Sequence, residues 1–295
     1  MSEKLPGYGG QALIEGVMMR GRNTCAIAVR APDGQIRTQT ETLGRLYQSG
    51  WARLPLLRGL LVLWDALVLG MRALTFSANI QAGGEESIDR GAMAATLVAS
   101  LALGLGLFFL LPAGVGYLAE RWLHISAWSA NLVEGLVRLA LLVGYIWAIG
   151  QIPDIGRVFA YHGAEHQTIN AFESGSELTP EQVGRFPVEH ARCGTAFLLT
   201  VVLFSIVVFS ALGPMPLLPR LASRVLMVPV LAAISYEYIR LTSRWAERTW
   251  ARPLVAPNLA LQRLTTRQPD PSMIEVAIAA FQAMRTAEEG SAPAD

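Results

Sequence analysis

Two long stretches without a formal charge constrain the fold of this 295-residue chain more than any other feature. Between Arg90 and Glu120 lie 29 uncharged residues, and between Arg192 and Arg220 lie 27. A transmembrane helix needs about 20 consecutive apolar residues, so either stretch is long enough to cross a bilayer. Charged residues make up only 16% of the chain, whereas about 25% is usual in soluble domains. The sequence therefore predicts an integral membrane protein.

Two further segments predict additional membrane spans. One, at about 131–151, has Glu134 and Arg138 in its first turns, and the other, at about 221–239, has a charge near each end. Glu134 and Arg138 are four residues apart, so we expect an intrahelical ion pair near the outer face of the membrane. The expected fold is thus mainly α, a polytopic protein with about four transmembrane helices in residues 91–240.

The distribution of Lys and Arg predicts the orientation of these spans. Residues 1–90 hold ten of the 24 basic residues and residues 240–295 hold seven, while the loops near 120–130 and 214–224 hold one and two. With four spans both termini share one side, and the basic side is cytoplasmic. The loop at 152–194 is then cytoplasmic as well. The net charge of only +1 gives no indication of nucleic-acid binding.

Residues 1–50 are predicted to form a small cytoplasmic β element. The β-prone runs at 26–30 and 35–40 flank a Pro-Asp-Gly turn, which supplies the residues that such turns prefer. Upstream, glycines at both ends of 9–21 favour a second pair of strands, with Glu15 exposed to solvent.

Residues 51–90 are predicted to form an amphipathic helix and a linker. The apolar segment at 54–79 has a polar residue at every seventh position, namely Arg58, Asp65, Arg72 and Asn79. On a helix these residues form one slowly drifting stripe, which is typical of an interfacial or re-entrant helix, or of one that packs its stripe against protein. A buried span is the competing interpretation, because three charges inside a bilayer must be paired.

Residues 241–295 are predicted to form a cytoplasmic segment with a short helix from about 272 to 287. Ser272 and Glu275 have the spacing of a capping box at its start. Apolar residues lie along one face, so the helix is expected to pack on the cytoplasmic part; they are Met273, Ile274, Ala277, Ile278, Phe281 and Met284.

Three of the four histidines fall within 29 residues, and two of them belong to the run His162-Gly163-Ala164-Glu165-His166. On a helix, residues four apart share a face, so both imidazoles can reach one metal ion. Glu165 occupies the position at which inverted zinc-protease motifs have their general base. His190 and Cys193 follow in the same loop.

We therefore predict a metal site, for zinc or another divalent transition metal. His162 and His166 are the first ligands, and His190, Cys193 and Glu237 compete for the remaining positions, because helix ends at one membrane surface lie at similar depth. Zinc accepts imidazole, thiolate and carboxylate ligands together. Three protein ligands with an open position make a catalytic site, and four make a structural one.

A simpler interpretation of the same residues is also open. A lone H-x-x-E-H run is a weak motif, and two histidines on a helix are often ordinary surface residues. Cys193 can be a small buried residue at the start of a helix, and Glu237 can pair with Arg240 or Arg244.

Several longer motifs extend along the chain: 9–21 (GGQALIEGVMMRG), 70–74 (GMRAL), 76–79 (FSAN), 161–166 (YHGAEH), 190–195 (HARCGT), 235–237 (SYE) and 264–267 (LTTR). With these motifs the chain resembles, over nearly its whole length, the YqhQ family of bacterial membrane proteins. The family is a domain of unknown function whose label, predicted metal-dependent enzyme, implies a metal site. The resemblance adds weight to Glu15 as a residue of interest and to the predicted metal site, and it implies that the protein lies in the inner membrane. The family usually has proline in place of Ala191, which alters none of the expected ligands.

Two functions follow as hypotheses. The first is a metal-dependent hydrolase that acts at the membrane, with Glu165 as the general base. The second is a non-enzymatic scaffold, chaperone or lipid-binding or partner-binding factor with a structural metal site. The lipid bilayer is the expected partner in both cases, together with a membrane-protein partner or a homo-oligomer, and no nucleic acid is expected.

The predicted topology can be tested by cysteine labelling after Cys25 and Cys193 are replaced. A cysteine introduced at Ser176 should be protected from an impermeant reagent in intact cells, because the 152–194 loop is expected to be cytoplasmic. A cysteine at Ser126 should react. The opposite pattern would contradict the model.

Overall fold

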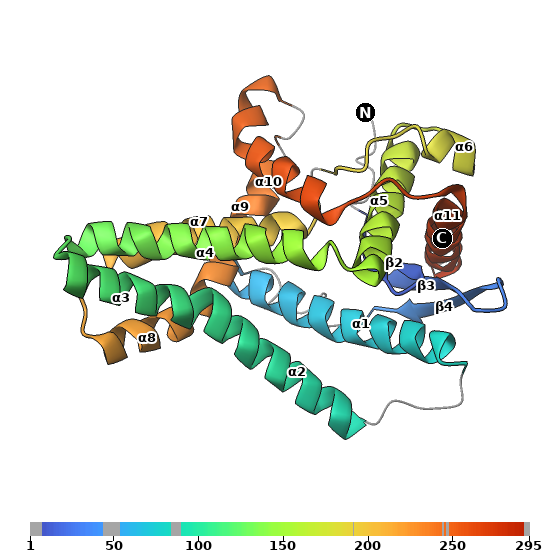
Figure 1. Ribbon diagram of the computed structural model, residues 1–295. Coiled ribbons are helices and arrows are strands. Elements are labelled where there is room, and N and C mark those ends of the chain that lie inside the picture. The colour runs from blue at the N-terminus through green and yellow to red at the C-terminus, as the bar shows by residue number, and fades with distance from the viewer. Residues whose placement is uncertain are drawn as a thin grey trace.

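A computed structural model describes residues 8–43, 54–83, 90–190, 192–243, 245 and 248–291. These residues are mainly helical, with an antiparallel sheet near the N-terminus (Figure 1). The strands are β1 (Gly9–Leu13), β2 (Gly16–Arg20), β3 (Thr24–Arg30) and β4 (Ile36–Thr42). The helices are α1 (Leu57–Gln81), α2 (Arg90–Leu105), η3 (Gly106–Leu110), α3 (Leu111–Leu123), α4 (Ala127–Ile149), α5 (Pro153–Glu173), α6 (Pro180–Val183), α7 (Thr195–Ala211), α8 (Leu217–Leu226), α9 (Val228–Ser243), η4 (Thr249–Ala251), α10 (Arg252–Thr265) and α11 (Pro271–Ser291).

The sheet has the strand order β1-β2-β3-β4, with every neighbouring pair antiparallel. Both expected strand pairs are therefore confirmed. Successive residues of a strand point to opposite faces. In β3, Cys25 and Ile27 pack in one core with α1, while Ala26 and Ala28 pack in another with α5 and α11. The sheet is buried on both faces, so β3 is apolar at almost every position instead of alternating.

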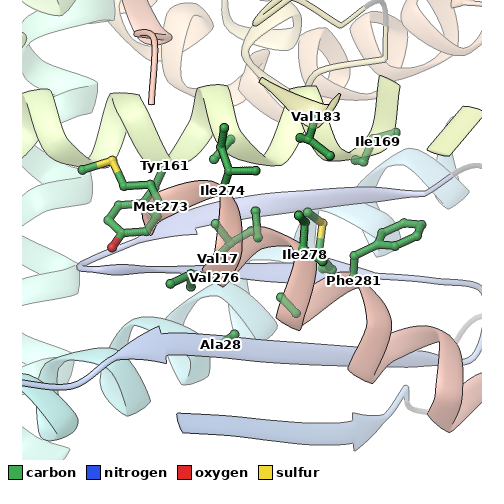
Figure 2. Close-up of a cluster of buried hydrophobic side chains, with 14 of the residues drawn as sticks. Val17, Ala28, Tyr161, Ile169, Val183, Met273, Ile274, Val276, Ile278 and Phe281 are labelled. Carbon is green, nitrogen blue, oxygen red and sulfur yellow. The ribbon is translucent and has the colours of Figure 1, made fainter. Parts of the chain in front are cut away.

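The C-terminal helix covers the sheet face opposite α1, beside α5 (Figure 1). Figure 2 shows Ile274, Ile278 and Phe281 of α11 in the same cluster as Val17 of β2 and Tyr161 of α5. The expected apolar face of this helix is confirmed, because its six residues are all buried.

The expected capping box of this helix is wrong. Asp270 caps the helix instead, since its carboxylate accepts hydrogen bonds from the Met273 N–H at 3.0 Å and the Ser272 hydroxyl. Glu275 pairs with Arg30 on β3 at 2.9 Å. The cap and the ion pair fix the start of α11 against the sheet.

Three helices in the described ranges are long and apolar enough to cross a membrane, namely α1, the continuous run Ala94–Leu123, and α4. Helices α8 and α9 add a fourth span if this pair, bent by 44° at Met227, crosses as one unit. The second uncharged stretch is shorter as a helix than expected, because α7 ends at Ala211 after 17 residues. Gly213 there has a φ of 71°, and Pro214 follows. The described helices thus have the character of a membrane protein.

Helix α1 combines the length of a span with charges that pair with other parts of the chain. Its polar stripe makes three ion pairs: Arg58 with Glu237, Asp65 with Arg20 at 3.5 Å, and Arg72 with Glu41 at 3.8 Å. Arg58 and Asp65 thus lie against protein, whereas the Arg72 side chain is 67% exposed, and α1 also fits the competing interpretation as a span. Packing on both α9 and the sheet makes α1 the link between the apolar helices and the N-terminal layer.

Charges inside the helix bundle form a connected network. The expected pair of Glu134 with Arg138 is present at 2.7 Å, and Glu134 also accepts from Arg224 of α8 at 2.7 Å. Arg220 pairs with Glu120 at 2.9 Å, and Asn131 accepts hydrogen bonds from both α8 arginines. The side chains of the three arginines are 1% exposed. The pair is therefore part of a buried network that holds α8 on α4, the arrangement that charges inside a membrane require.

Candidate metal centre

Helix α5 and the segment before α7 bring three metal-binding side chains together. His162 and His166 lie on one face of α5, with ring centroids 4.4 Å apart. Cys193 reaches the same point from the start of α7, with its Sγ 3.3 Å from Nε2 of His162. One ligand atom from each of the three residues lies within 4.8 Å of the other two. This compact group fits a single ion.

The outer nitrogen of each imidazole is held by the backbone. Nδ1 of His162 donates to the Thr265 carbonyl at 2.9 Å, and Nδ1 of His166 donates to the Val188 carbonyl at 2.6 Å. A carbonyl can only accept, so the neutral form of each ring has its proton on Nδ1 and leaves Nε2 free to bind a metal. Such hydrogen bonds are typical of metal-ligating histidines, because they fix the tautomer and the ring orientation. Burial, together with the neighbouring His162, lowers the pKa of His166 well below its ordinary value, which keeps the ring neutral.

Two glycines of α5 allow the carbonyl of Thr265 to reach His162. The segment after α10 crosses α5 closely, and the Arg267 N–H donates to the Phe159 carbonyl at 2.9 Å. A Cβ on Gly163 would collide with the Arg267 carbonyl oxygen, and one on Gly156 would meet the Arg267 guanidinium. The glycine inside the H-x-x-E-H run therefore has a packing role: it lets the supporting backbone approach.

A cavity of about 380 Å³ lies beside the cluster. His162, Cys193 and Glu165 line it, together with residues 8–12 at the start of the sheet. Glu165 is 4% exposed, and the N–H of Gly10 donates to its carboxylate. The pKa of Glu165 is raised to about 7, mainly by burial; His162 opposes the increase, the nearby Cys193 adds to it, and the Gly10 N–H opposes it. A carboxylate, two ligands and an open space thus share one cavity.

His190 lies next to the cluster but outside the group of three. Its ring is 5.7 Å from that of His166, and it lines the cavity. Gln262 fixes its backbone on both sides, accepting from the N–H at 2.9 Å and donating to the carbonyl at 3.0 Å. Its Nε2 is 3.6 Å from Glu173. Burial lowers the pKa of His190 to about 4, so it is a neutral residue beside the three donors.

Glu237 does not join the cluster, so the structure corrects its assignment as a competing ligand. Its carboxylate receives both Nε and Nη2 of Arg58, the former at 2.6 Å, together with the Leu56 N–H. Helix ends at similar depth in the membrane do not have to bring their side chains to one point. Helix α9 packs against α1, so the Glu237 side chain is directed toward α1 and away from the cluster. Among the described residues Glu237 pairs with Arg58 and not with the expected Arg240. The other expected partner, Arg244, lies outside the described residues, as does Ala191.

Glu15 is paired, whereas the sequence suggested a solvated side chain. Its carboxylate accepts from Arg157 at 2.5 and 2.6 Å and from the Tyr161 hydroxyl at 3.2 Å. The Arg157 guanidinium holds the pKa of Glu15 below its ordinary value. Glu15 forms the β1–β2 turn with a φ of 53°, so the turn is attached to α5 one residue before His162.

The residues that support the ligands were not found from the sequence. They act mainly through backbone groups, which no side-chain pattern reveals: the carbonyls of Val188 and Thr265, and the N–H of Gly10. A signal did exist, because Thr265 and Gly10 lie inside two of the long motifs noted above. What these motifs do becomes visible only in the fold, where the segment after α10 crosses α5.

The ligand set can be tested by elemental analysis of the purified chain. We expect about one zinc-like ion per chain, and near-zero metal in the His162→Ala, His166→Ala double variant, because too few donors remain to hold the ion. Glu237→Gln is the matched control and should keep its metal, since Arg58 occupies that carboxylate. Stoichiometric metal in the double variant would rule out this ligand set.

Comparisons with known proteins find relatives of unknown function. Residues 54–287 match the family model described as "Protein of unknown function (DUF1385)". The chain is 31% identical over 296 residues to the uncharacterized protein YqhQ of Bacillus subtilis (strain 168), covering 94% of this chain and 91% of YqhQ. No solved structure matches significantly. The chain therefore belongs to the DUF1385 family, to which its resemblance to YqhQ also points.

Proposed function

We propose that this membrane protein is a metal-dependent hydrolase that acts at the membrane surface. One observation carries the proposal: three converging donor atoms lie beside a cavity that a buried carboxylate also lines. Three protein ligands and an open position are the arrangement of catalytic zinc sites. When bound there, a divalent ion would lower the pKa of water and polarise the bond to be cleaved.

The residues fit zinc better than a hard cation. Two imidazoles and one thiol suit zinc and similar transition metals, whereas magnesium and calcium prefer oxygen ligands. The backbone carbonyls on both Nδ1 atoms supply the outer support that such sites use. Cys193 would bind such an ion as the thiolate. Burial raises the pKa of its thiol, and a bound cation would favour its deprotonation.

Glu165 is the residue proposed to move the proton. It lines the cavity next to His162, so its carboxylate can accept a proton from an attacking water molecule there. The Gly10 N–H orients the carboxylate from the sheet side. The sheet layer is then part of the site, because it supplies the wall against which Glu165 is held.

The proposed setting is the cytoplasmic face of a bacterial inner membrane, with both termini in the cytoplasm. The basic residues near both ends of the chain support this orientation. Helix α4 ends at Ile149 and α7 begins at Thr195, next to the ligands. The cavity is therefore next to the ends of apolar helices, which favours a membrane-embedded or membrane-proximal substrate.

A structural metal in a scaffold is the second candidate. Its support is that ligands and their carbonyl partners come from separate segments: α5, the loop before α7, and the end of α10. An ion there would link the apolar helices to the N-terminal layer. In that case α1 could bind lipid or another membrane protein, including a second copy.

The Glu165→Gln variant separates the two candidates. The amide is nearly isosteric but cannot accept the proton, so the variant should keep its metal and its abundance while losing about 10² to 10⁴ of its rate. The measurement is complementation of a deletion phenotype, with protein level and metal content determined in parallel.

The control variant is His162→Ala. Loss of a structural ligand removes folding free energy, so under the scaffold model this variant should lower abundance while Glu165→Gln is nearly silent. Full complementation by Glu165→Gln at normal abundance would refute the hydrolase and leave the scaffold.

A further inference from the structure

A second cavity, of about 430 Å³, lies inside the helix bundle. Its walls come from η3, α4, α7 and the start of α9, and they are almost entirely hydrocarbon and aromatic, as at Phe108, Leu142, Phe197 and Val202. This volume is typical of ligand-binding pockets. It is also far larger than the small voids of close-packed interiors. The cavity is therefore a candidate binding site for an apolar group.

The cavity is elongated along α4. The α4 side chains on its wall are Arg138, Leu142, Tyr145, Ile146 and Ile149, a single helical face whose ends are 11 residue steps apart. At 1.5 Å per residue this face is about 17 Å long. The hydrocarbon core of a bilayer is about 30 Å thick, so the cavity matches the depth of about one leaflet.

The two cavities meet at a shared wall. Phe159 and Thr265 line both of them. Thr265 is also the residue whose carbonyl holds His162. On the other side, Cys193 faces the first cavity and Phe197, about one helical turn further on, faces the second. The apolar cavity thus begins where the proposed metal centre ends.

The second cavity reaches the outer surface of the bundle. Tyr145 of α4 and Leu198 of α7 line it, and these residues are 46% and 45% exposed. Tyr145 lies on α4, which is long and apolar enough to cross a membrane, and Leu198 lies on the shorter apolar helix α7. A bilayer chain can therefore enter from the side without passing through water.

We propose that this cavity binds one acyl chain of a membrane lipid and presents the polar end of that lipid to the metal centre. The inference rests on the proposed function, and it names the substrate class of that site as an acyl lipid. The nearly uncharged wall favours hydrocarbon. Arg138, at the far end, already donates to Phe108, Ser205 and Glu134, so it is engaged with the protein and does not need a ligand anion.

Photolabelling tests the proposal on the full chain. The purified protein is placed in nanodiscs that contain phosphatidylcholine with a diazirine in the middle of one acyl chain, and labelled peptides are mapped by mass spectrometry. Label should concentrate on cavity residues such as Leu142, Phe197 and Val202. Ala232→Phe, which adds bulk to the cavity wall, should reduce it about tenfold.

Val230→Phe is the matched control, because Val230 lies on the same helix, is 42% exposed and does not line the cavity. It should label like the unmodified chain. Val202→Phe fills the cavity from α7 and provides a second test should Ala232→Phe fail to fold. Equal cavity labelling in the folded bulky variants, or label confined to lipid-facing residues such as Leu136, would overturn the acyl-chain assignment.

Metal content, measured on the same samples, distinguishes this failure from failure of the proposed function. An unlabelled cavity in a metal-loaded chain refutes the acyl-chain site alone. Specific labelling in a chain that binds no metal supports the lipid site and refutes the hydrolase.

Discussion

The close crossing of residues 265–267 over α5 is the contact on which the candidate site depends. Gly156 and Gly163 leave the space for it, and the Arg267 N–H donates to the Phe159 carbonyl. Because the chain comes this close, the Thr265 carbonyl can fix the ring of His162. The same crossing builds the wall between the polar and the apolar cavity. One backbone approach therefore sets the geometry of a ligand and separates two chemical environments.

The buried charges of the bundle have a complementary role. Arg138 connects the Phe108 carbonyl of the π-helical turn η3 to Glu134 and to Ser205 of α7. A buried ion pair is costly to break, because removing one partner leaves an uncompensated charge, at about 3–5 kcal/mol. The network thus fixes how α4, α7 and α8 lie against one another. Cys193 lies two residues before the start of α7, so this network indirectly positions the third donor.

Periodicity predicted the parts of the fold in which side-chain character determines structure. The strands of the N-terminal sheet and the apolar face of α11 are examples. Composition predicted the approximate number of spans, but it failed at α7, where Gly213 and Pro214 end the helix inside an uncharged stretch that composition alone treats as continuous. Composition measures apolar length, whereas helix length depends on individual backbone breakers.

For the site, the spacing of His162 and His166 and the nearby cysteine identified the three donors that the structure brings together. Glu237 was misassigned, because the argument used membrane depth and ignored the rotation of α9, which turns the carboxylate toward Arg58. Glu15 was misjudged for a similar reason: its partner Arg157 is 142 residues away. Long-range pairs and backbone carbonyls leave no local pattern, so the supporting residues required the structure.

X-ray absorption spectroscopy of the metal-loaded protein tests the central claim most directly. The account predicts a zinc-edge spectrum with two nitrogen scatterers at about 2.0–2.1 Å and one sulfur at about 2.3 Å. In Cys193→Ser the sulfur contribution should disappear, while the imidazole scattering is retained. A wild-type spectrum without sulfur, or one that Cys193→Ser leaves unchanged, would contradict a metal centre built from His162, His166 and Cys193.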